Sequence, residues 1–344
     1  PSPVSALMSG VMLKTAIYGL LRVSFDLLQT RVWWWGLVLL LVGLASALFG
    51  VVFSAVQTDM KRLLAYSSIE NIGLIVLGMG LALIFSAFQL SGFAALALLA
   101  LLYHCLNHAF FKSLLFLSTG SVLHATGERN LGKLGGLIHQ MPWTAWLALI
   151  GVLACAGLPP LNGFVSEWLL LQSFLFTPAV PHGYLNMLLP VFAGAIALVA
   201  ALAGFTMVKF FGIIFLGQPR EGKLAHAHDA SRLSRLGLLW LATGCVLLGL
   251  MPNVVITLIT PVLDALIGVA QPLGVDGGNW IFLAPFSPER ASYSPLIFVC
   301  GIVVLVGAAG FVVHRRFPAR AKRVPPWDCG FPLQTGRMQD TSEG

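Results

Sequence analysis

The sequence predicts an all-α integral membrane protein with about eight transmembrane helices, one of them broken near its centre. Of the 344 residues, 58% are hydrophobic and only 10% are charged, a balance outside the range of soluble domains. The mean hydropathy is +0.88. The apolar residues come in runs of about 20, the length that a helix needs to cross roughly 30 Å of hydrocarbon. The chain is therefore expected to lie in a lipid bilayer.

Polar residues divide the apolar runs into eight predicted spans. They cover residues 4–21, 32–56, 63–87, 94–120, 143–177, 185–216, 236–257 and 295–313. The fifth span contains the sequence GLPPLNG at 157–163, where two glycines and two prolines cannot continue a regular helix. Residues 257–272 could form a short interfacial helix in the long loop before the last span.

The positions of the 20 Lys and Arg residues predict how the chain is oriented. When the predicted loops are assigned alternately to the two sides of the membrane, Arg22, Arg31 and Arg290 fall on one side and most of the others on the opposite side. The positive-inside rule puts the more basic side in the cytoplasm, together with the C-terminus. A cell (inner) membrane protein is expected, and its charge requires no nucleic-acid partner.

The cysteines and the glycine motifs give no sign of a resident cofactor. Five cysteines are scattered without a C-x-x-C pair, so neither an iron–sulfur cluster nor a structural zinc site is indicated. The chain also has no Walker loop and no G-x-G-x-x-G motif. We expect no cofactor, no metal and no catalytic residue, so any redox chemistry belongs to partner subunits.

The first predicted span carries Lys14 near its middle, in GVMLKTAIYGLLR. This position is too far from either end for the side chain to reach water easily. A lysine there needs a hydrogen-bonding partner or a hydrated cavity, and buried lysines can hold and release protons. The alternative is a structural lysine that is hydrogen-bonded to a neighbouring helix.

The fourth span carries three titratable residues at intervals of four: His104, His108 and Lys112, in LYHCLNHAFFKSLLF. This spacing places them along one stripe of a helix, about 6 Å apart. Bridging waters between such neighbours would allow protons to hop. Two alternatives remain open: a metal bound by the two histidines, and a purely structural polar stripe between helices.

Glu167 follows the break in the fifth span by about one helical turn. Non-helical backbone at membrane depth is tolerated where it lines a cavity, and an acidic residue beside it is a candidate functional residue. Alternatively, Glu167 only forms hydrogen bonds with backbone groups that the break leaves free, or it lies closer to the membrane interface.

Two further titratable residues lie in the third and sixth spans. Glu70 is part of a polar patch in LLAYSSIENIGL and is expected to pair with a buried lysine. Lys209, in FTMVKFFGIIFLG, lies close enough to the basic side for its amine to reach the interface, which is the simpler interpretation.

These seven residues place a titratable group in five of the eight predicted spans. Each such group costs a few kcal/mol in lipid, and a shared hydrated path offsets this cost better than separate sites would. The sequence therefore predicts a proton pathway that comprises Lys14, Glu70, His104, His108, Lys112, Glu167 and Lys209.

Four segments, in order along the chain, resemble the antiporter-like proton-pumping subunits of respiratory complex I, Mrp antiporters and membrane-bound hydrogenases. They are PSPVSALMSGVMLKTAIYGLLR, DMKRLLAYSSIENIG, HCLNHAFFKSLLFLSTGSVLH and GLPPLNGFVSEW. Within that family, SIENIG and the tail sequence PPWDCGF resemble the branch that contains hydrogenase-4 component B and formate hydrogenlyase subunit 3.

The resemblance implies two inverted five-helix repeats, each with a broken helix and a proton half-channel. On this basis we expect a connecting helix and loop at 1–31, the second repeat at 32–217, C-terminal transmembrane helices at 218–314 and a basic cytoplasmic tail at 315–344. The first repeat would precede Pro1. The family pattern is not uniform, because some members carry His at the position of Glu70 or Lys at the position of Glu167.

The resemblance also implies roles for individual residues. Lys14 matches the lysine that connects the two half-channels, Lys112 or the His104/His108 pair matches the central relay, and Glu167 matches the acidic outlet residue. The implied partners are other membrane subunits and a peripheral redox arm, a hydrogenase with or without a formate dehydrogenase. The chain would be a non-catalytic, proton-translocating subunit of such a complex. An Mrp-type cation/proton antiporter subunit and a non-conducting membrane anchor are the alternatives.

Overall fold

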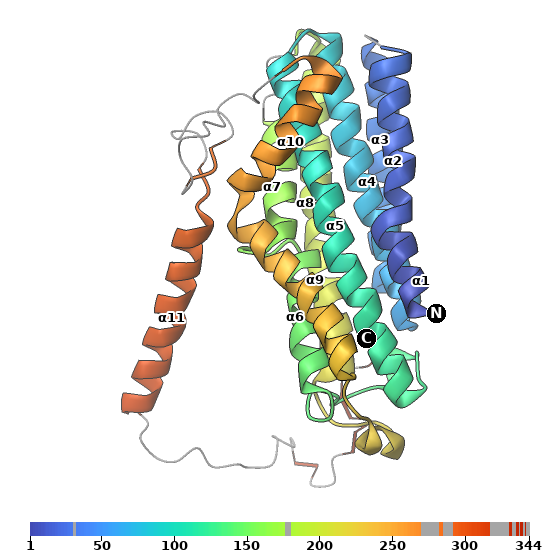
Figure 1. The fold of residues 1–344 in the computed structure, drawn as a ribbon, viewed down its shortest axis with the longest axis vertical. Coiled ribbons are helices and arrows are strands. Elements are labelled where there is room, and N and C mark those ends of the chain that lie inside the picture. Colours follow the sequence, from blue (N-terminus) through green and yellow to red (C-terminus); the bar gives the residue numbers. More distant parts are fainter. Residues whose placement is uncertain are drawn as a thin grey trace.

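The computed structural model describes residues 1–29, 32–175, 180–269, 282–284 and 292–316, with short pieces from residue 330 onward. Arg31, Arg290, Cys329 and most of the predicted tail lie outside the described residues. Figure 1 shows long helices that run side by side to form a bundle. Among the described residues no strand is present beyond isolated bridges, so the all-α prediction is confirmed.

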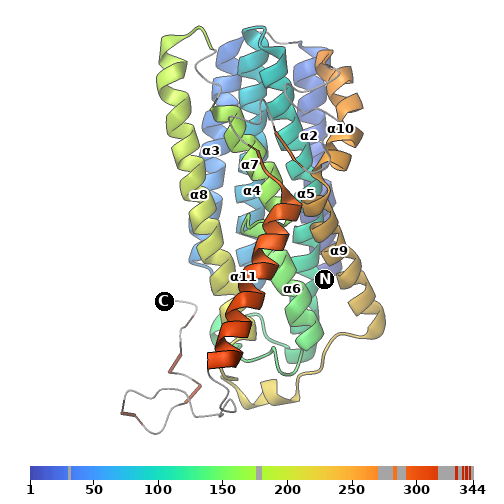
Figure 2. The same cartoon turned by 90° about the vertical axis from the view of Figure 1, so that its left-hand side faces the viewer.

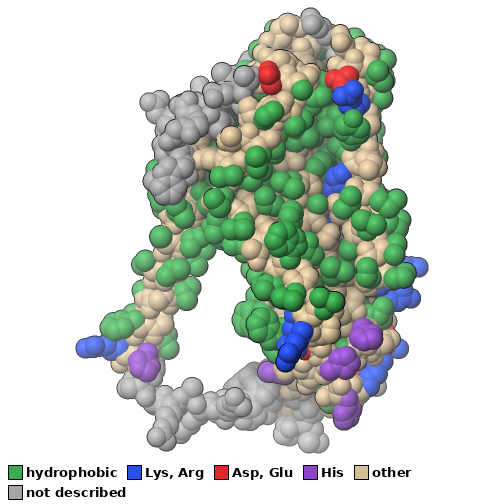
Figure 3. Space-filling view, viewed as in Figure 1, with side chains coloured by type: hydrophobic (Ala, Val, Ile, Leu, Met, Phe, Trp, Pro, Cys, Tyr) green, Lys and Arg blue, Asp and Glu red, His purple; other side chains and the backbone are tan. Residues whose placement is uncertain are grey.

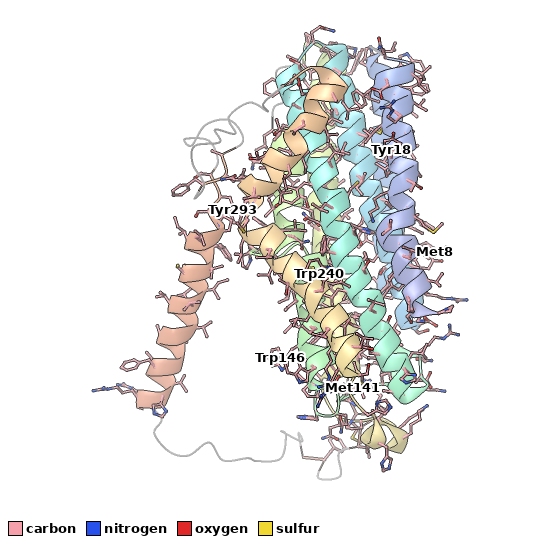
Figure 4. The ribbon with its side chains drawn as sticks, in the orientation of Figure 1. Met8, Tyr18, Met141, Trp146, Trp240 and Tyr293 are labelled. Carbon is pink, nitrogen blue, oxygen red and sulfur yellow. The ribbon has the colours of Figure 1, made fainter. Side chains whose placement is uncertain are left out.

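The first membrane-length helix runs from Ser2 to Leu27. It consists of α1 (Ser2–Leu7) and α2 (Leu13–Leu21) with π-helical stretches at Met8–Met12 and Arg22–Leu27. Its outer side faces away from the bundle, where Met8 and Tyr18 are 53% and 63% exposed and point outward in Figure 4.

Nine further α-helices follow in the described chain. They are α3 (Trp33–Ala55), α4 (Met60–Ala87), α5 (Ser91–Thr126), α6 (Pro142–Cys155), α7 (Asn162–Phe174), α8 (Gly183–Phe215), α9 (Arg232–Leu250), α10 (Pro252–Ile267) and α11 (Pro295–Arg316). In the view of Figure 2, α8 forms one edge of the bundle. In Figure 1, α11 stands apart from the bundle, and its side chains are exposed along most of its length.

Seven helices of the described chain are long and apolar enough to cross a membrane. The predicted fifth span is the pair α6 and α7, each too short to count alone, with the expected break between them at 156–161. The interfacial helix predicted at 257–272 is replaced in the structure by a helix that starts earlier. This helix, α10, begins at Pro252 directly after α9 and packs against α5. Figure 1 shows α10 continuing towards the upper end of the bundle.

α3 and α4 approach so closely that their backbones nearly touch. A Cβ on Gly43 would lie 2.8 Å from the carbonyl oxygen of Gly73, and a Cβ on Gly73 would lie 2.6 Å from that of Gly43. Gly50 makes a similarly close approach to the backbone of Glu70. Small residues allow such contacts in membranes, where packing rather than exclusion of water drives helix association. These glycines therefore fix the depth of Glu70 against α3.

The bend between α9 and α10 follows from Pro252. In a continuous helix the carbonyl of Leu248 would accept the N–H of residue 252, and proline has none. The Tyr103 hydroxyl of α5 donates a hydrogen bond to this carbonyl instead. Tyr103 thereby gives the free carbonyl at the bend a hydrogen-bond donor and connects the bend to α5.

We expect Tyr103→Phe to lower the free energy of unfolding by about 1–3 kcal/mol, because the Leu248 carbonyl loses its donor in a buried place. Equilibrium unfolding in detergent micelles measures this change. Tyr18→Phe is the matched control, since Tyr18 is 63% exposed, and should alter stability by less than about 0.5 kcal/mol. Equal stability of the two variants would contradict this role of Tyr103.

Lys and Arg side chains gather mainly at the lower end of the bundle in Figure 3, and apolar side chains cover its flank. The loops at this end are held by buried or half-buried acids. Asp229 accepts hydrogen bonds from the backbone N–H of Trp143 at 2.8 Å and the hydroxyl of Thr144 at 2.6 Å, which caps α6. The carboxylate of Glu128 accepts hydrogen bonds from backbone N–H groups, of which that of Asn130 has the largest effect. These hydrogen bonds hold the pKa of the Glu128 carboxyl below its usual value.

Candidate functional site

A layer of buried polar side chains separates two clusters of apolar residues, one towards each end of the bundle. On α4 the lower cluster ends at Leu64 and the upper one begins at Leu74, and on α5 they meet between Tyr103 and Phe111. The buried polar residues in these two intervals are Ser67, Ser68, Glu70, Asn71, His104, Asn107 and His108. The candidate site is therefore near mid-height in the bundle, where a charged group is most costly.

Lys14 reaches this layer from the first helix. Its Nζ donates to the carbonyl of Ser9 at 2.8 Å and to Nδ1 of His108 on α5. Next to it, the hydroxyls of Ser9 and Ser68 are hydrogen-bonded at 2.7 Å. The first helix is thus joined to both α4 and α5 by polar contacts.

Lys112 and Glu70 are connected through Ser67. Nζ of Lys112 donates to the Ser67 hydroxyl at 2.6 Å, and this hydroxyl donates to Oε2 of Glu70 at 3.1 Å. Lys112 is fully buried and Glu70 is 3% exposed. The expected pairing of Glu70 with a buried lysine is thus found with a serine between the two charged groups.

His104 faces two helices other than its own. Nε2 lies 3.1 Å from Oδ1 of Asn71 on α4, and Nδ1 lies 3.0 Å from the hydroxyl of Ser166 on α7. Asn107 of α5 adds a bond of 2.9 Å to the same hydroxyl. Both ring nitrogens are therefore engaged across the bundle and not along the stripe towards His108.

The break between α6 and α7 brings Glu167 back against the end of α6. Gly157 has φ +63°, a conformation that favours glycine, and a Cβ there would lie 2.5 Å from Oε2 of Glu167. The half-buried carboxylate therefore occupies the space that a larger residue at 157 would fill. Cys155, beside Ser67 at 3.8 Å, lies within electrostatic range of Glu70, Lys112 and Glu167.

Lys209 does not join these groups. Its Nζ donates to the backbone carbonyls of Ala55 at 2.6 Å and Gln57 at 3.5 Å. These carbonyls belong to the C-terminal end of α3, where a lysine satisfies unpaired acceptors and complements the helix dipole. The geometry matches the simpler interpretation of Lys209, as a side chain that extends to the end of the bundle.

Three buried side-chain atoms in this layer have no hydrogen-bond partner among the described residues. They are Nε2 of His108, Oδ1 of Asn107 and Oδ1 of Asn162. Since buried polar groups normally find a partner, the layer has capacity for small polar ligands such as water. A chain of such groups can hold, pass and release protons.

The sequence alone did not identify Ser166, Asn107 or Asn162 as members of the site. A signal was available, because Ser166 precedes Glu167, Asn107 precedes His108, and polar residues in apolar spans are functional candidates by default. Asn162 lies four residues before Ser166 on the same face of α7.

Comparison with known proteins agrees with the resemblance in the motifs. The chain is 35% identical over 333 residues to hydrogenase-4 component B of Escherichia coli (strain K12), covering 96% of this chain and 49% of that protein. It is also 35% identical over 330 residues to formate hydrogenlyase subunit 3 of the same strain, covering 96% of this chain and 52% of that protein. The chain spans about half the length of the curated relatives it matches.

A solved structure shares the fold. The membrane-bound sulfane sulfur reductase, an archaeal respiratory membrane complex, contains a chain that aligns with a TM-score of 0.74 at 24% identity, over 97% of this chain and 52% of that one. Residues 1–197 match the family model described as "NADH:quinone oxidoreductase/Mrp antiporter, TM". The chain therefore belongs to the NADH:quinone oxidoreductase/Mrp antiporter family of multi-pass membrane subunits.

Proposed function

We propose that the chain forms the second half of a proton-translocating subunit in a membrane-bound hydrogenase or formate hydrogenlyase-type complex. Two relatives at 35% identity are named as a hydrogenase-4 component and a formate hydrogenlyase subunit. In this proposal a peripheral arm of partner subunits carries out electron transfer. Other membrane subunits flank this one in the cell (inner) membrane.

The observation that carries the proposal is the gathering of six titratable side chains in one polar layer. Lys14 meets His108, Lys112 meets Glu70 through Ser67, and the remaining two, His104 and Glu167, face the broken helix pair. These residues come from four different helices, so the bundle assembles them. If each of these six side chains had a separate structural role, they would not need to lie at the same depth in the bundle.

The contacts suggest how charge moves. Lys112 and Glu70 stabilise each other's charged forms across the Ser67 hydroxyl, and adding or removing a proton at either changes the preferred state of the other. Lys14 and His108 form a second pair with coupling of the opposite sign, because both charged forms are cations and a proton on one disfavours a proton on the other. A redox event in a partner that shifts charge at one end would then move protons through the layer. No covalent bond of a substrate changes in this chain.

Each part of the chain has its own place in the proposed subunit. Residues 1–31 connect to the preceding repeat, residues 32–217 form the second half-channel around the polar layer, and 218–314 supply the C-terminal helices. The basic loops at the lower end face the cytoplasm, together with the tail at 315–344, as the positive-inside rule requires.

Glu167→Gln tests the proposal, because glutamine keeps the shape of the side chain and cannot carry its proton. Vesicles that contain the complete complex are assayed for protons moved per electron transferred. We expect this ratio to fall at least about tenfold, as expected when a proton-transfer group is lost. Glu221→Gln, in the loop after α8, is the control and should leave it unchanged. An unchanged ratio in Glu167→Gln would support the non-conducting anchor instead.

A second candidate function is cation/proton exchange of the Mrp type. It is favoured by the amide oxygens of Asn107 and Asn162 beside the helix break, which have no hydrogen-bond partner in the part of the chain that the structure describes, because Na⁺ is held by oxygen ligands. Sodium-driven proton exchange in vesicles that contain only this subunit would establish the exchanger. Proton movement that depends on electron transfer and is indifferent to sodium would exclude it.

A further inference from the structure

The side chain of Asn71 determines which nitrogen of His104 carries hydrogen. Nδ2 of Asn71 donates to the carbonyl of Ser67 at 2.7 Å, and a carbonyl can only accept, so the amide orientation is fixed. Oδ1 of Asn71 must then face His104 Nε2, at 3.1 Å. Since an amide oxygen also only accepts, Nε2 of His104 must be protonated.

The hydroxyl of Ser166 has two possible acceptors for its single proton. It lies 3.0 Å from His104 Nδ1 and 3.1 Å from the carbonyl of Gly163. In neutral His104 with hydrogen on Nε2, Nδ1 has a free lone pair, and Ser166 donates to it. If His104 takes a second proton on Nδ1, this N–H donates to Ser166, and the hydroxyl proton turns to Gly163.

Asn107 keeps Ser166 in the position that this exchange needs. Its Nδ2 donates to the Ser166 hydroxyl at 2.9 Å and to the carbonyl of Asn162 at 2.7 Å. The Ser166 oxygen therefore has one lone pair occupied and keeps the other, with its own proton, for the exchange with His104 and Gly163.

We propose that Asn71 and Ser166 are positioning residues that hold neutral His104 with hydrogen on Nε2, and that a second proton on His104 binds at Nδ1, where the Ser166 hydroxyl accepts the new N–H. The amide oxygen of Asn71 keeps the hydrogen on Nε2, because it accepts that N–H in both states of the ring. The acceptor Gly163 lies one turn before Glu167, so the state of His104 is communicated to the turn that carries this acid. The second part, proton exchange, rests on the proposed function, whereas the tautomer does not.

Nitrogen-15 NMR of the full chain in lipid bilayers, labelled at histidine, tests the tautomer. His104→Gln identifies the His104 signals by their loss. We expect neutral His104 with hydrogen on Nε2. In Asn71→Leu the preference should reverse, since Nδ1–H can still donate to Ser166 while Nε2 has lost its acceptor. Hydrogen on Nδ1 in the unmodified protein would overturn the inference.

Ser166→Ala tests the exchange in vesicles that contain the complete complex. Protons moved per electron should fall at least about tenfold, and Ser166→Thr should restore them because it keeps a hydroxyl. Ser173→Ala is the control: the hydroxyl of this buried serine of α7 donates to the carbonyl of Leu169 in its own helix at 2.9 Å. Normal transport in Ser166→Ala would overturn the exchange. Failure of the proposed function would be recognised by a different result, namely a normal ratio of protons to electrons in Glu167→Gln.

Discussion

Lys112→Met is expected to abolish proton movement that is coupled to electron transfer, with a decrease of about a hundredfold or more. Lys112 is fully buried, and its amine is the cation that reaches Glu70 through Ser67. Methionine keeps much of the volume of the side chain and removes its charge and its donors, so the relay is interrupted while packing is maintained. Proton transfer by a positioned side chain typically contributes factors of 10² to 10⁴.

The measurement for Lys112→Met is acidification of vesicles that contain the complete complex, with electron transfer recorded in parallel. Lys133→Met is the matched control, because Lys133 is an exposed loop lysine that pairs with Glu128 at 3.9 Å. It should move as many protons per electron as the unmodified complex. Coupled transport at the normal ratio in Lys112→Met would remove Lys112 from the pathway.

Gly73→Leu is expected to have the largest effect on stability. A Cβ at this position would lie 2.6 Å from the carbonyl of Gly43 and 2.5 Å from the backbone nitrogen of Ala47. These are backbone atoms that cannot move aside without separating α3 from α4. Overpacking of this kind costs about 3 kcal/mol or more, and because Gly73 is close to Glu70, the polar layer would be displaced as well.

Unfolding of purified protein in mixed micelles measures the effect of Gly73→Leu. Gly204→Leu is the control, since a Cβ on Gly204 of α8 would meet nothing within 4 Å. It should not lower the free energy of unfolding, because the added side chain meets no atom and leucine favours a helix more than glycine does. Comparable stability of the two variants would contradict the close α3–α4 packing.

The membrane fold and the broken helix could be predicted from the sequence because each depends on local properties. Length and hydropathy specify a span, and the prolines in GLPPLNG specify the break, which the structure places between Cys155 and Asn162. The bend at Pro252 was missed, although proline was again the signal. Its stability depends on Tyr103, which lies far away in the sequence.

The candidate residues could be identified from the sequence, but their partners could not. His104 and Lys112 share a stripe of α5, yet the first faces Asn71 and Ser166 and the second faces Ser67. Which partner each one meets depends on the rotation and spacing of α4 and α7 relative to α5. Helical periodicity gives no information on that spacing.

We propose that the buried titratable groups share one hydrated path, which a high-resolution cryo-electron microscopy map of the complete complex would reveal. We expect ordered water peaks within hydrogen-bonding distance of Nε2 of His108 and of the Glu167 carboxylate, continuous with Nζ of Lys112. Apolar side chains that fill the space between these three groups, leaving each one isolated, would contradict it.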